Sequence, residues 1–387
     1  MTPIKLTANC SLRNFPGRLV ARITREQVPA SLRPDYALVT SNVDALQDYS
    51  GYGCIFVSSE KASSSPVLKN LPVAVMADCS HLHPGYVVSI NDRTGFVRTV
   101  YRPESPHNTL FATDRCNSNC LMCSQPPKDI DDSYLIGENL KIIDLIDEGP
   151  EVIGITGGEP TLLGNGLIEI LDRLKTKLPR TSVHMLTNGR KYANARFAHE
   201  VGEVRHPSFV SGIPLYADVA AVHDYVVQSE GAFDETLEGI YNAAQSGLGI
   251  EIRIVLHKQT IPRLVRTAEF IYANFPFVSH VALMGLENMG YVKKNWSELW
   301  IDPVHYMDEL RAAALFLHRR GLVVSIYNLQ LCLLPRELRF FARQSISDFK
   351  NVYLPECDPC LRKGACSGFF LSQVNRHSGY IRPFLTA

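Results

Sequence analysis

The chain has 387 residues, of which 45% are hydrophobic and 20% are charged, so it can bury a large core and is too apolar to be disordered. Its 39 Lys and Arg residues balance its 39 Asp and Glu residues, and the basic residues are scattered, which argues against a nucleic-acid partner. No apolar stretch reaches the ~18–20 residues of a membrane span, and the first residues lack a signal-peptide pattern. We expect a cytoplasmic protein with no membrane partner.

Residues 1–105 contain short β-type runs separated by turn residues, and we expect a small, mostly β N-terminal domain there. The last two runs flank the Gly-containing loop Asn91–Gly95, whose length suits a hairpin. The runs are Gly53–Val57, Val73–Met76, Tyr86–Ile90 and Phe96–Tyr101.

Strands, loops and amphipathic helices alternate over residues 106–327. This alternation predicts a parallel sheet with helices outside, and about 220 residues suit a partial (β/α)6 barrel better than a closed eight-fold one. The expected fold class is therefore α/β, with residues 328–387 as a Cys-rich extension. The strand candidates are Thr109–Thr113, Val152–Thr156, Ser182–Leu186, Phe209–Ile213, Ile250–Leu256, Val278–Met284 and Leu322–Tyr327.

Ten cysteines in a cytoplasmic protein indicate metal or redox chemistry rather than disulfides. Seven of them form two groups. The remaining three, Cys10, Cys54 and Cys79, lack the spacing of metal ligands, and we interpret them as structural thiols.

The first group follows the first barrel strand as C-x3-C-x2-C, with Cys116, Cys120 and Cys123. Three thiolates on one loop can hold a [4Fe–4S] cluster and leave one iron open to another ligand. A structural zinc ion is the alternative, but it takes four protein ligands, and no fourth Cys or His is close in the sequence. The spacing favours the cluster.

The next two strand candidates also run into polar, glycine-bearing loops, Gly157-Gly158-Glu159-Pro160 and Thr187-Asn188-Gly189. The two adjacent glycines allow the backbone to approach a ligand, and the Glu159 carboxylate can accept a hydrogen bond from a cationic amine. An ordinary strand-to-helix turn is the alternative for GGEP alone. Its position after the three-cysteine loop favours a ligand site.

C-x3-C-x2-C followed by GGEP resembles the radical S-adenosylmethionine (radical SAM) superfamily. The resemblance implies that Cys116, Cys120 and Cys123 hold a [4Fe–4S] cluster whose open iron binds S-adenosylmethionine. It also implies reductive cleavage to a 5′-deoxyadenosyl radical, with a ferredoxin or flavodoxin as electron donor. The implied cofactor-binding residues are Met122, Gly157, Gly158, Glu159, Pro160, Thr187 and Asn188.

The second group consists of Cys332, Cys357, Cys360 and Cys366. Four thiolates can complete a [4Fe–4S] cluster or bind structural zinc, and spacing alone does not separate the two. The group is similar to the SPASM or twitch extensions of peptide-modifying radical SAM enzymes. That likeness implies a second, auxiliary [4Fe–4S] cluster.

The middle of the barrel departs from the pattern of those enzymes, which often show Ser-Leu-Asp-Gly and then His-Asp-x-x-Arg-Gly. His223 and Asp224 are present, but Val227 replaces the arginine, and the serine is absent or shifted to Ser211. Arg253 is a candidate partner for a carboxylate, with an ion pair to Glu251 as the alternative. Candidates for proton or radical handling are Tyr216, Asp218, His223 and Asp224. The alternative is helix capping by Asp218 and ordinary polar groups whose hydrogen bonds are satisfied.

The stretches NTLFATDRCNSNCLMCSQPPKD, IPLYADVAAVHDYV and NVYLPECDPC resemble the HxsC branch of radical SAM maturases. This resemblance implies an enzyme that modifies a ribosomal peptide with His-Xaa-Ser repeats, beside a second radical SAM maturase. Two alternatives remain. One is a radical SAM enzyme that acts on a small molecule or activates another enzyme, and the other is a non-enzymatic iron–sulfur or zinc protein.

Overall fold

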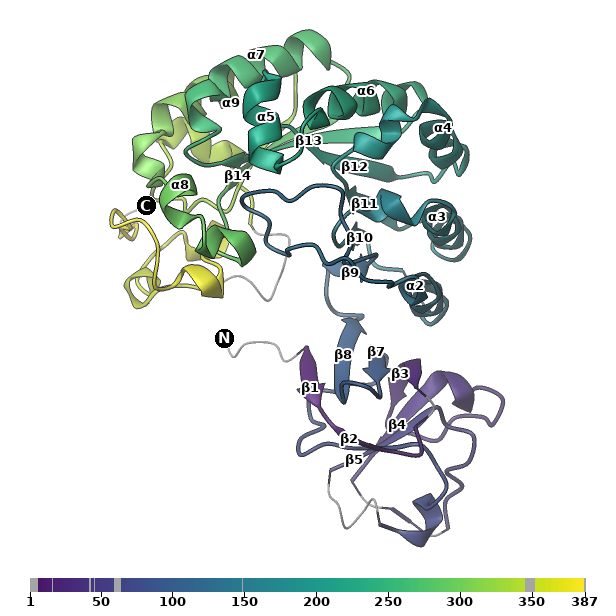
Figure 1. Ribbon diagram of the computed structural model, residues 1–387. Coiled ribbons are helices and arrows are strands. Elements are labelled where there is room, and N and C mark those ends of the chain that lie inside the picture. Colours follow the sequence, from purple (N-terminus) through teal and green to yellow (C-terminus); the bar gives the residue numbers. More distant parts are fainter. Residues whose placement is uncertain are drawn as a thin grey trace.

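Three parts follow one another along the chain (Figure 1). The computed structural model describes residues 6–15, 17–41, 43–44, 46–58, 64–147, 149–344 and 352–385. A mixed β-sheet comes first, a parallel sheet with helices second, and a Cys-rich region last. The fold class is α/β, as predicted.

The N-terminal part is an eight-stranded mixed sheet with the order β1-β8-β7-β3-β4-β5-β6-β2. β7 and β8 form the predicted antiparallel hairpin, and β5 and β6 match two further predicted runs. The strands are β1 (Thr7–Asn9), β2 (Ser11–Arg13), β3 (Arg18–Thr24), β4 (Tyr36–Thr40), β5 (Cys54–Val57), β6 (Val73–Val75), β7 (Val87–Asn91) and β8 (Phe96–Tyr101).

The chain closes this sheet on itself at Cys10. β1 and β2 lie at opposite edges of the sheet, yet only Cys10 separates them in the sequence. One bent strand therefore pairs with β8 through its first half and with β6 through its second half. Because the enclosed side chains, such as Phe56 and Ile90, form their own buried apolar cluster, this part is a small β-barrel.

The three isolated cysteines lie in or against this apolar cluster. Cys54 and Cys79 are buried and Cys10 is partly buried, and none of the three is in a disulfide. Burial raises the pKa of Cys10 to about 11, and it raises the pKa of Cys54 further. Protonated thiols packed among apolar side chains agree with their interpretation as structural residues.

The second part is a seven-stranded parallel sheet whose strands are neighbours in chain order, from β9 to β15. Each predicted strand is present, with ends within two residues of those expected. The strands are β9 (Asn108–Phe111), β10 (Val152–Thr156), β11 (Ser182–Leu186), β12 (Phe209–Pro214), β13 (Gly249–Leu256), β14 (His280–Gly285) and β15 (Val324–Tyr327).

Helices cover one face of this sheet, and the sheet curves as a partial barrel (Figure 1). Alternate residues of β13 show the two faces, because Ile250, Ile252 and Ile254 join the core beneath the helices. Glu251 and Arg253 therefore face the inner side. The helices are α2 (Tyr134–Asp144), α3 (Asn165–Lys177), α4 (Ala195–Glu203), α5 (Ala220–Val227), α6 (Ala232–Gln245), α7 (Leu264–Asn274), α8 (Trp296–Leu299) and α9 (Met307–Arg319).

The N-terminal barrel packs against the first strand and helix of the second part. Val20 and Val87 share a core cluster with Leu110 and Ile142. At the rim of this contact, Arg18 lies over the ring of Tyr134, 3.2 Å from its centroid. Two ion pairs, Arg22 with Asp147 and Lys141 with Asp35, join the same surfaces.

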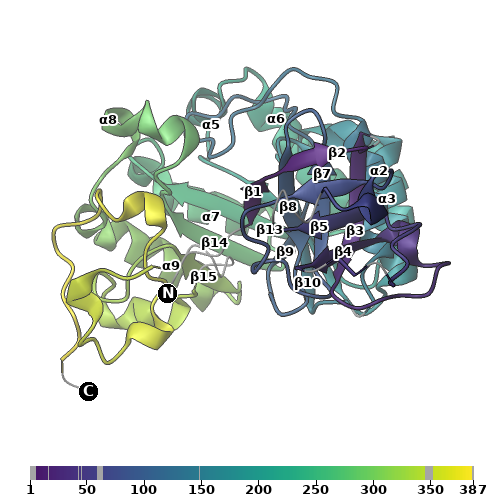
Figure 2. The same cartoon turned by 90° about the horizontal axis from the view of Figure 1, so that it is seen from below.

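The Cys-rich region lies beside β14 and β15, and the N-terminal sheet lies near β9 and β10 (Figure 2). The described part of this region contains only short 3-10 helices and isolated bridges. Its own small core includes Leu333, Leu354, Phe369 and Ile381. The 3-10 helices are η8 (Arg336–Phe341), η9 (Pro355–Cys357), η10 (Lys363–Ala365) and η11 (Leu371–Gln373).

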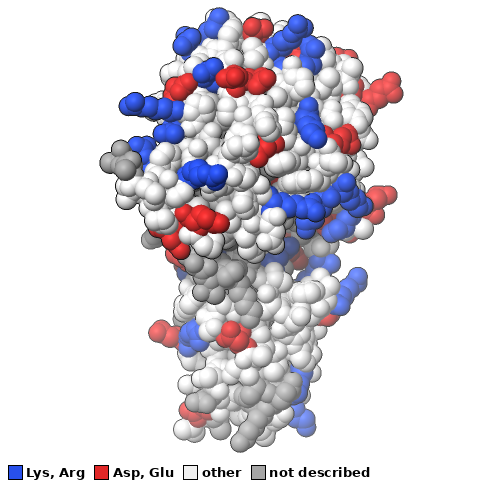
Figure 3. Space-filling model, turned by 90° about the vertical axis from the view of Figure 1, so that its left-hand side faces the viewer, with Lys and Arg blue, Asp and Glu red and all other residues white. Residues whose placement is uncertain are grey.

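Acidic and basic side chains are interspersed over most of the face that Figure 3 shows. None of the helices in the described ranges is both long enough and apolar enough to span a bilayer.

Candidate functional site

Three loops that follow neighbouring strands lie together at one end of the parallel sheet. They are the cysteine loop after β9 (residues 114–123), residues 157–160 after β10 and residues 187–190 after β11. The Gly158 N–H donates to the carbonyl oxygen of Thr113 at 2.7 Å, and the Glu159 N–H donates to that of Arg115 at 2.8 Å. The pairing of β9 with β10 thus continues past the strands and holds the cysteine loop against GGEP.

Gly157 and Gly158 are required by the close approach of these two segments. Gly157 has a φ of +141°, and a Cβ there would lie 2.4 Å from the carbonyl oxygen of Thr113. At Gly158 a Cβ would lie 2.1 Å from the carbonyl oxygen of Arg115. The main chain of the cysteine loop fills this space, so the glycines position the loop rather than leave room for a ligand there.

Asp132 holds the start of the cysteine loop through hydrogen bonds to its side chain. Its carboxylate is fully buried and accepts hydrogen bonds from the Thr113 hydroxyl at 2.8 Å, from the Asp114 N–H and from the Arg115 guanidinium at 3.2 Å. Three donors balance the desolvation of this buried charge.

The rest of the loop is bonded to other loops and to a helix end. Val226 and Val227, the last residues of α5, accept hydrogen bonds from the N–H groups of Leu121 and Asn119 at 2.9 and 3.0 Å. The Asn295 amide donates to the Leu121 carbonyl oxygen at 2.8 Å. The fold itself therefore holds the main chain that carries the three thiols.

The Glu159 side chain joins the ends of β10 and β11. It is fully buried, and its Oε1 accepts from the Thr161 N–H at 3.0 Å and from the hydroxyls of Thr161 and Thr187, both at 2.6 Å. Its Oε2 accepts from the Asn188 N–H at 2.6 Å. Oε1 is thus saturated by protein donors, whereas Oε2 keeps one lone pair for a further donor.

Residues 188–190 contact the cysteine loop directly. The Asn188 side-chain amide donates to Asn117 Oδ1 at 2.6 Å and lies 4.0 Å from Cys116 Sγ. The Arg190 guanidinium donates to the Asn117 carbonyl oxygen and to the Ser118 hydroxyl, at 3.0 Å for the latter. Its Nε also forms an ion pair with Glu235 Oε2 at 2.6 Å. A fixed cation therefore lies beside the loop.

The three thiols titrate at high pH in the absence of a bound cation. Burial raises the pKa of Cys116 to about 11, and burial followed by the charges of Cys123 and Cys116 raises the pKa of Cys120 to about 12. Burial also raises the pKa of Cys123. The charge of Arg190 lowers the pKa of both Cys116 and Cys120. A cationic centre would deprotonate these thiols on binding.

The donor set fits an iron–sulfur cluster, because each of the three thiols on the anchored loop can bind a different iron. A structural zinc ion takes four protein ligands, and this loop supplies three thiols.

Residues 110–271, which include the three loops, match the radical SAM superfamily. This segment is therefore similar to a radical SAM domain. It extends from β9 to α7 and so contains most of the parallel sheet.

The chain also resembles curated proteins over the same part. It is 32% identical to the Fe-coproporphyrin III synthase of Methanosarcina barkeri over 152 residues, which is 38% of this chain and 36% of that protein. It is 30% identical to the GTP 3′,8-cyclase of Petrotoga mobilis over 157 residues, which is 38% of this chain and 45% of that protein. The match thus spans less than half the length of each relative.

Solved structures with a similar chain course include anSMEcpe with bound AdoMet and the Cp18Cys peptide, at a TM-score of 0.49 and 14% identity. That match covers 71% of this chain and 92% of anSMEcpe. Streptococcus suis SuiB bound to S-adenosylmethionine has a TM-score of 0.44 and 13% identity, with 56% of this chain and 49% of SuiB covered.

Two of the four candidates for proton or radical handling have structural partners. Asp224 accepts hydrogen bonds from the N–H groups of Gly231 and Phe233 at 2.8 and 2.7 Å, so it caps the start of α6. Asp218 forms a two-point ion pair with Arg263, with both contacts at 2.6 Å. The capping residue is therefore Asp224, and the alternative of capping by Asp218 is wrong.

Tyr216 and His223 lie behind the cysteine loop. Tyr216 packs in one buried cluster with Met122 and Val226. Burial, and then the charges of Cys120 and Cys123, raise its pKa well above the ordinary value, and Cys120 packs against the same buried cluster. His223 is buried against it, and burial lowers the pKa of His223 to about 4.

The positions of Ser211 and Arg253 do not support the cofactor contacts expected of them. Ser211 shares its side of β12 with the core residues Phe209 and Ile213, and its hydroxyl lies 3.2 Å from that of Tyr192. This side of the strand faces the helices, which is why Ser211 cannot reach the inner face. Arg253 is on the inner face but donates to Glu251 at 2.9 Å, which is the alternative ion pair.

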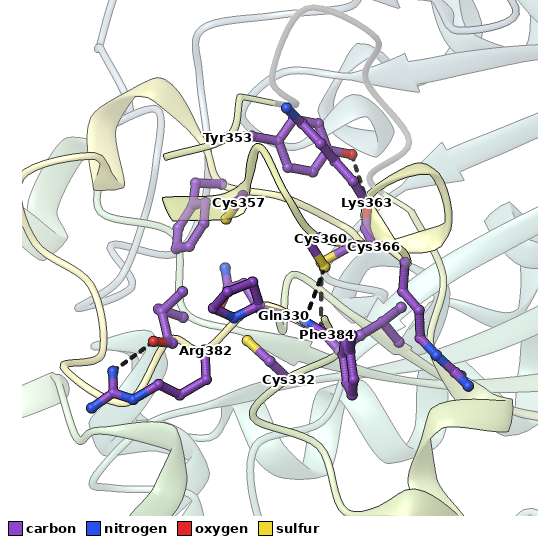
Figure 4. A pocket seen from close by; sticks show the side chains of 14 residues that line it. Gln330, Cys332, Tyr353, Cys357, Cys360, Lys363, Cys366, Arg382 and Phe384 are labelled. Atoms are coloured by element: carbon purple, nitrogen blue, oxygen red, sulfur yellow. Dashed lines mark hydrogen bonds between the residues drawn. The ribbon is translucent and has the colours of Figure 1, made fainter. Parts of the chain in front are cut away.

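The four cysteines of the second group meet around one cavity that is partly open to solvent (Figure 4). Cys332 comes from the chain that follows β15, and the other three come from residues 357–366. All four are free and partly exposed. The pKa of Cys332 and that of Cys357 are raised, mainly by burial.

Sequence reasoning missed Arg190, Asp132 and Asn295 as parts of the site. Each holds the cysteine loop through a hydrogen bond, and Asn295 does so from a position 174 residues away. Arg190 directly follows the Thr187–Gly189 motif, so its place one residue past a motif loop is the only sequence signal among the three.

Proposed function

We propose that this chain is a radical SAM enzyme that modifies a ribosomally made peptide with His-Xaa-Ser repeats. The radical SAM chemistry is supported by the anchored loop with the three thiols of Cys116, Cys120 and Cys123. Three thiolates leave one iron of a [4Fe–4S] cluster without a protein ligand. The resemblance to the superfamily assigns that iron to S-adenosylmethionine. When bound, the reduced cluster supplies the electron that cleaves the carbon–sulfur bond of this cofactor.

The protein's own residues position and enclose the cofactors in this proposal. Arg190 neutralises part of the thiolate charge and fixes the loop through Asn117 and Ser118. Glu159 offers the free lone pair of Oε2 to the ammonium group of S-adenosylmethionine. Met122 of the loop and Tyr216 behind it form an apolar wall that excludes water.

The second cysteine group is proposed to hold an auxiliary [4Fe–4S] cluster. Four thiols line one cavity, so a cluster there would have a protein ligand for every iron. Such a centre would serve in electron transfer or in contact with the peptide. Structural zinc is the competing occupant.

The lining of a second, partly open cavity supports a peptide substrate. It lies between the loops that follow β13 to β15 and the Cys-rich region. Aromatic, amide and cationic groups line it, which suit the main chain and mixed side chains of a peptide. They include Trp300, Tyr306, Gln330, Gln373 and Arg376.

The proposed partners follow from the resemblance to the HxsC branch. They are the precursor peptide, a second radical SAM maturase and a ferredoxin or flavodoxin, all in the cytoplasm.

A small molecule is the second candidate substrate. The relatives at 30–32% identity are a GTP 3′,8-cyclase and an Fe-coproporphyrin III synthase, and neither name indicates a peptide substrate. The sequence stretches shared with the maturase branch favour the peptide.

The test is an anaerobic reaction of the reconstituted protein with dithionite, S-adenosylmethionine and a synthetic peptide of His-Xaa-Ser repeats. We expect 5′-deoxyadenosine by chromatography and a mass change in the peptide. Cys116/Cys120/Cys123→Ala should abolish both products. Cys10/Cys54/Cys79→Ala removes as many thiols from the N-terminal barrel and should keep both.

Two results separate the alternatives. Release of 5′-deoxyadenosine with an unchanged peptide contradicts the peptide substrate and favours a small molecule or another enzyme as target. No 5′-deoxyadenosine under any condition leaves an iron–sulfur or zinc protein without this activity.

A further inference from the structure

A short segment near the end of the described chain lines the cavity of the second cysteine group. Residues Ile381–Phe384, called here the 381–384 segment, line the cavity together with the four cysteines (Figure 4). Ile381 is buried and packs in the small core with Leu333, Leu354 and Phe369, so one end of the segment is fixed to the rest of the Cys-rich region.

Phe384 is bonded through its main chain on both sides. Its N–H donates to Cys360 Sγ at 3.5 Å, and its carbonyl oxygen accepts from the Leu361 N–H at 2.9 Å. Because Leu361 follows Cys360 directly, these two bonds form a clamp between the 381–384 segment and the chain that carries this thiol.

The Phe384 ring is held by two cations. The guanidinium of Arg339 lies 4.7 Å from its centroid and that of Arg362 lies 5.4 Å from it. Cation–π contacts of this kind favour one position of the aromatic ring. Arg339 is itself tied to the Leu334 carbonyl oxygen at 3.1 Å, so the clamp is anchored in the fold.

A second main-chain N–H reaches another thiol of the same cavity. Leu331, next to Cys332, donates to Cys366 Sγ at 3.5 Å. Cys360 and Cys366 thus each accept an N–H bond, and the two donors come from different segments of the chain. Such bonds stabilise the more negative, reduced form of an iron–sulfur cluster and raise its reduction potential.

We propose that the 381–384 segment is part of the second cluster site, and that the Phe384 N–H raises the reduction potential of the cluster through Cys360. This inference rests on the proposed auxiliary cluster. Phe384, which lies outside the cysteine motif, would thus affect the reduction potential of that cluster.

The test compares Phe384→Pro with Phe384→Ala, both in the Cys116/Cys120/Cys123→Ala background so that one cluster is observed. Both substitutions remove the ring, but only proline removes the N–H. In redox titrations followed by EPR, we expect a more negative midpoint potential for F384P than for F384A. Equal potentials in two variants that each hold four irons overturn the inference and leave the auxiliary cluster intact.

Iron content distinguishes failure of the inference from failure of the proposed function. If the background variant itself holds no cluster after reconstitution, the auxiliary site and the inference both fall. If F384P alone does not hold iron, pulsed EPR on protein labelled with ¹⁵N-phenylalanine decides. We expect a ¹⁵N coupling to the reduced cluster that F384A abolishes. A spectrum unchanged by F384A overturns the inference.

Discussion

The Thr187 hydroxyl donates a hydrogen bond of 2.6 Å to the buried Glu159 carboxylate, although the two residues follow different strands. Together with the Asn188 N–H, this bond fixes the end of β11 to the end of β10. The cysteine loop rests on both of these ends, so one carboxylate determines how three loops lie together.

Glu159→Gln should therefore destabilise the protein and loosen the cysteine loop. The glutamine NH2 group would face an N–H or O–H group whose hydrogen bond the carboxylate now accepts, so that two donors would meet. A buried polar group left without a partner costs about 1–3 kcal/mol. We expect denaturant titrations to give a free energy of unfolding that is lower by that amount, and iron assays to give less iron bound per chain. Glu169→Gln, on the exposed side of α3, is the matched control and should change neither quantity. An E159Q protein as stable and iron-rich as the control would contradict the assigned role.

Arg190→Gln should weaken retention of the cluster more than it weakens the fold. The substitution removes the charge beside Cys116 and Cys120 and the contacts to Asn117 and Ser118. We expect iron release to a chelator to be several-fold faster than in wild type. Arg190→Lys keeps the charge and should fall between the two. Arg196→Gln removes an exposed arginine of α4 and should release iron at the wild-type rate, so equal acceleration there would refute a specific effect.

Gly158→Ala should displace the cysteine loop because the new Cβ would meet the Arg115 carbonyl oxygen at 2.1 Å. Overpacking of this kind costs about 1–3 kcal/mol. Gly137→Ala in α2 is a sharp control, since a Cβ there meets nothing within 4 Å. Alanine in a helix is favoured over glycine by roughly 0.5–1 kcal/mol, so G137A should raise the melting temperature while G158A lowers it. Parallel changes in the two variants would exclude the steric argument.

The two cysteine groups should contribute separately to the iron count. Loss of about four irons in Cys116/Cys120/Cys123→Ala and of about four others in Cys357/Cys360/Cys366→Ala is expected for two [4Fe–4S] clusters. Iron and sulfide assays on anaerobically reconstituted protein provide the measurement. One zinc and no sulfide attributable to the second group would show that its occupant is structural zinc.

Acidification should destabilise the protein through His223. Burial lowers its pKa to about 4 in the folded chain, whereas the unfolded chain has the ordinary value of 6.5. Between these values the unfolded state binds more protons, so stability falls as the pH falls. From pH 7 to pH 5.5 we expect a loss of roughly 1 kcal/mol from this residue. His223→Phe should show a smaller loss over that interval in urea titrations, and an identical loss would exclude His223 as the cause.

The sequence predicts the strands of the parallel sheet well because each is a short apolar run followed by a polar loop, as in Val152–Thr156 before Gly157. The same rule explains why the predicted motifs meet, since parallel strands in chain order end at one side. Local patterns were enough for this part of the site.

The parts that depend on distant partners escape such patterns. Asn295 reaches Leu121 across 174 residues, and β1 and β2 are three-residue strands too short to show a period. Ser211 illustrates a different limit. Its motif position favours a cofactor contact, but the parity of its strand turns the side chain toward the helices, and parity depends on where pairing begins.

The bent strand around Cys10 covers hydrogen-bonding edges that would otherwise be open. An exposed edge offers N–H and C=O groups to which a foreign chain can add a strand, the usual start of edge-to-edge aggregation. Here β8 and β6 are both paired with this strand over three residues each. For a protein proposed to handle extended peptides, that covering protects the N-terminal barrel from becoming an unintended template for its own substrate.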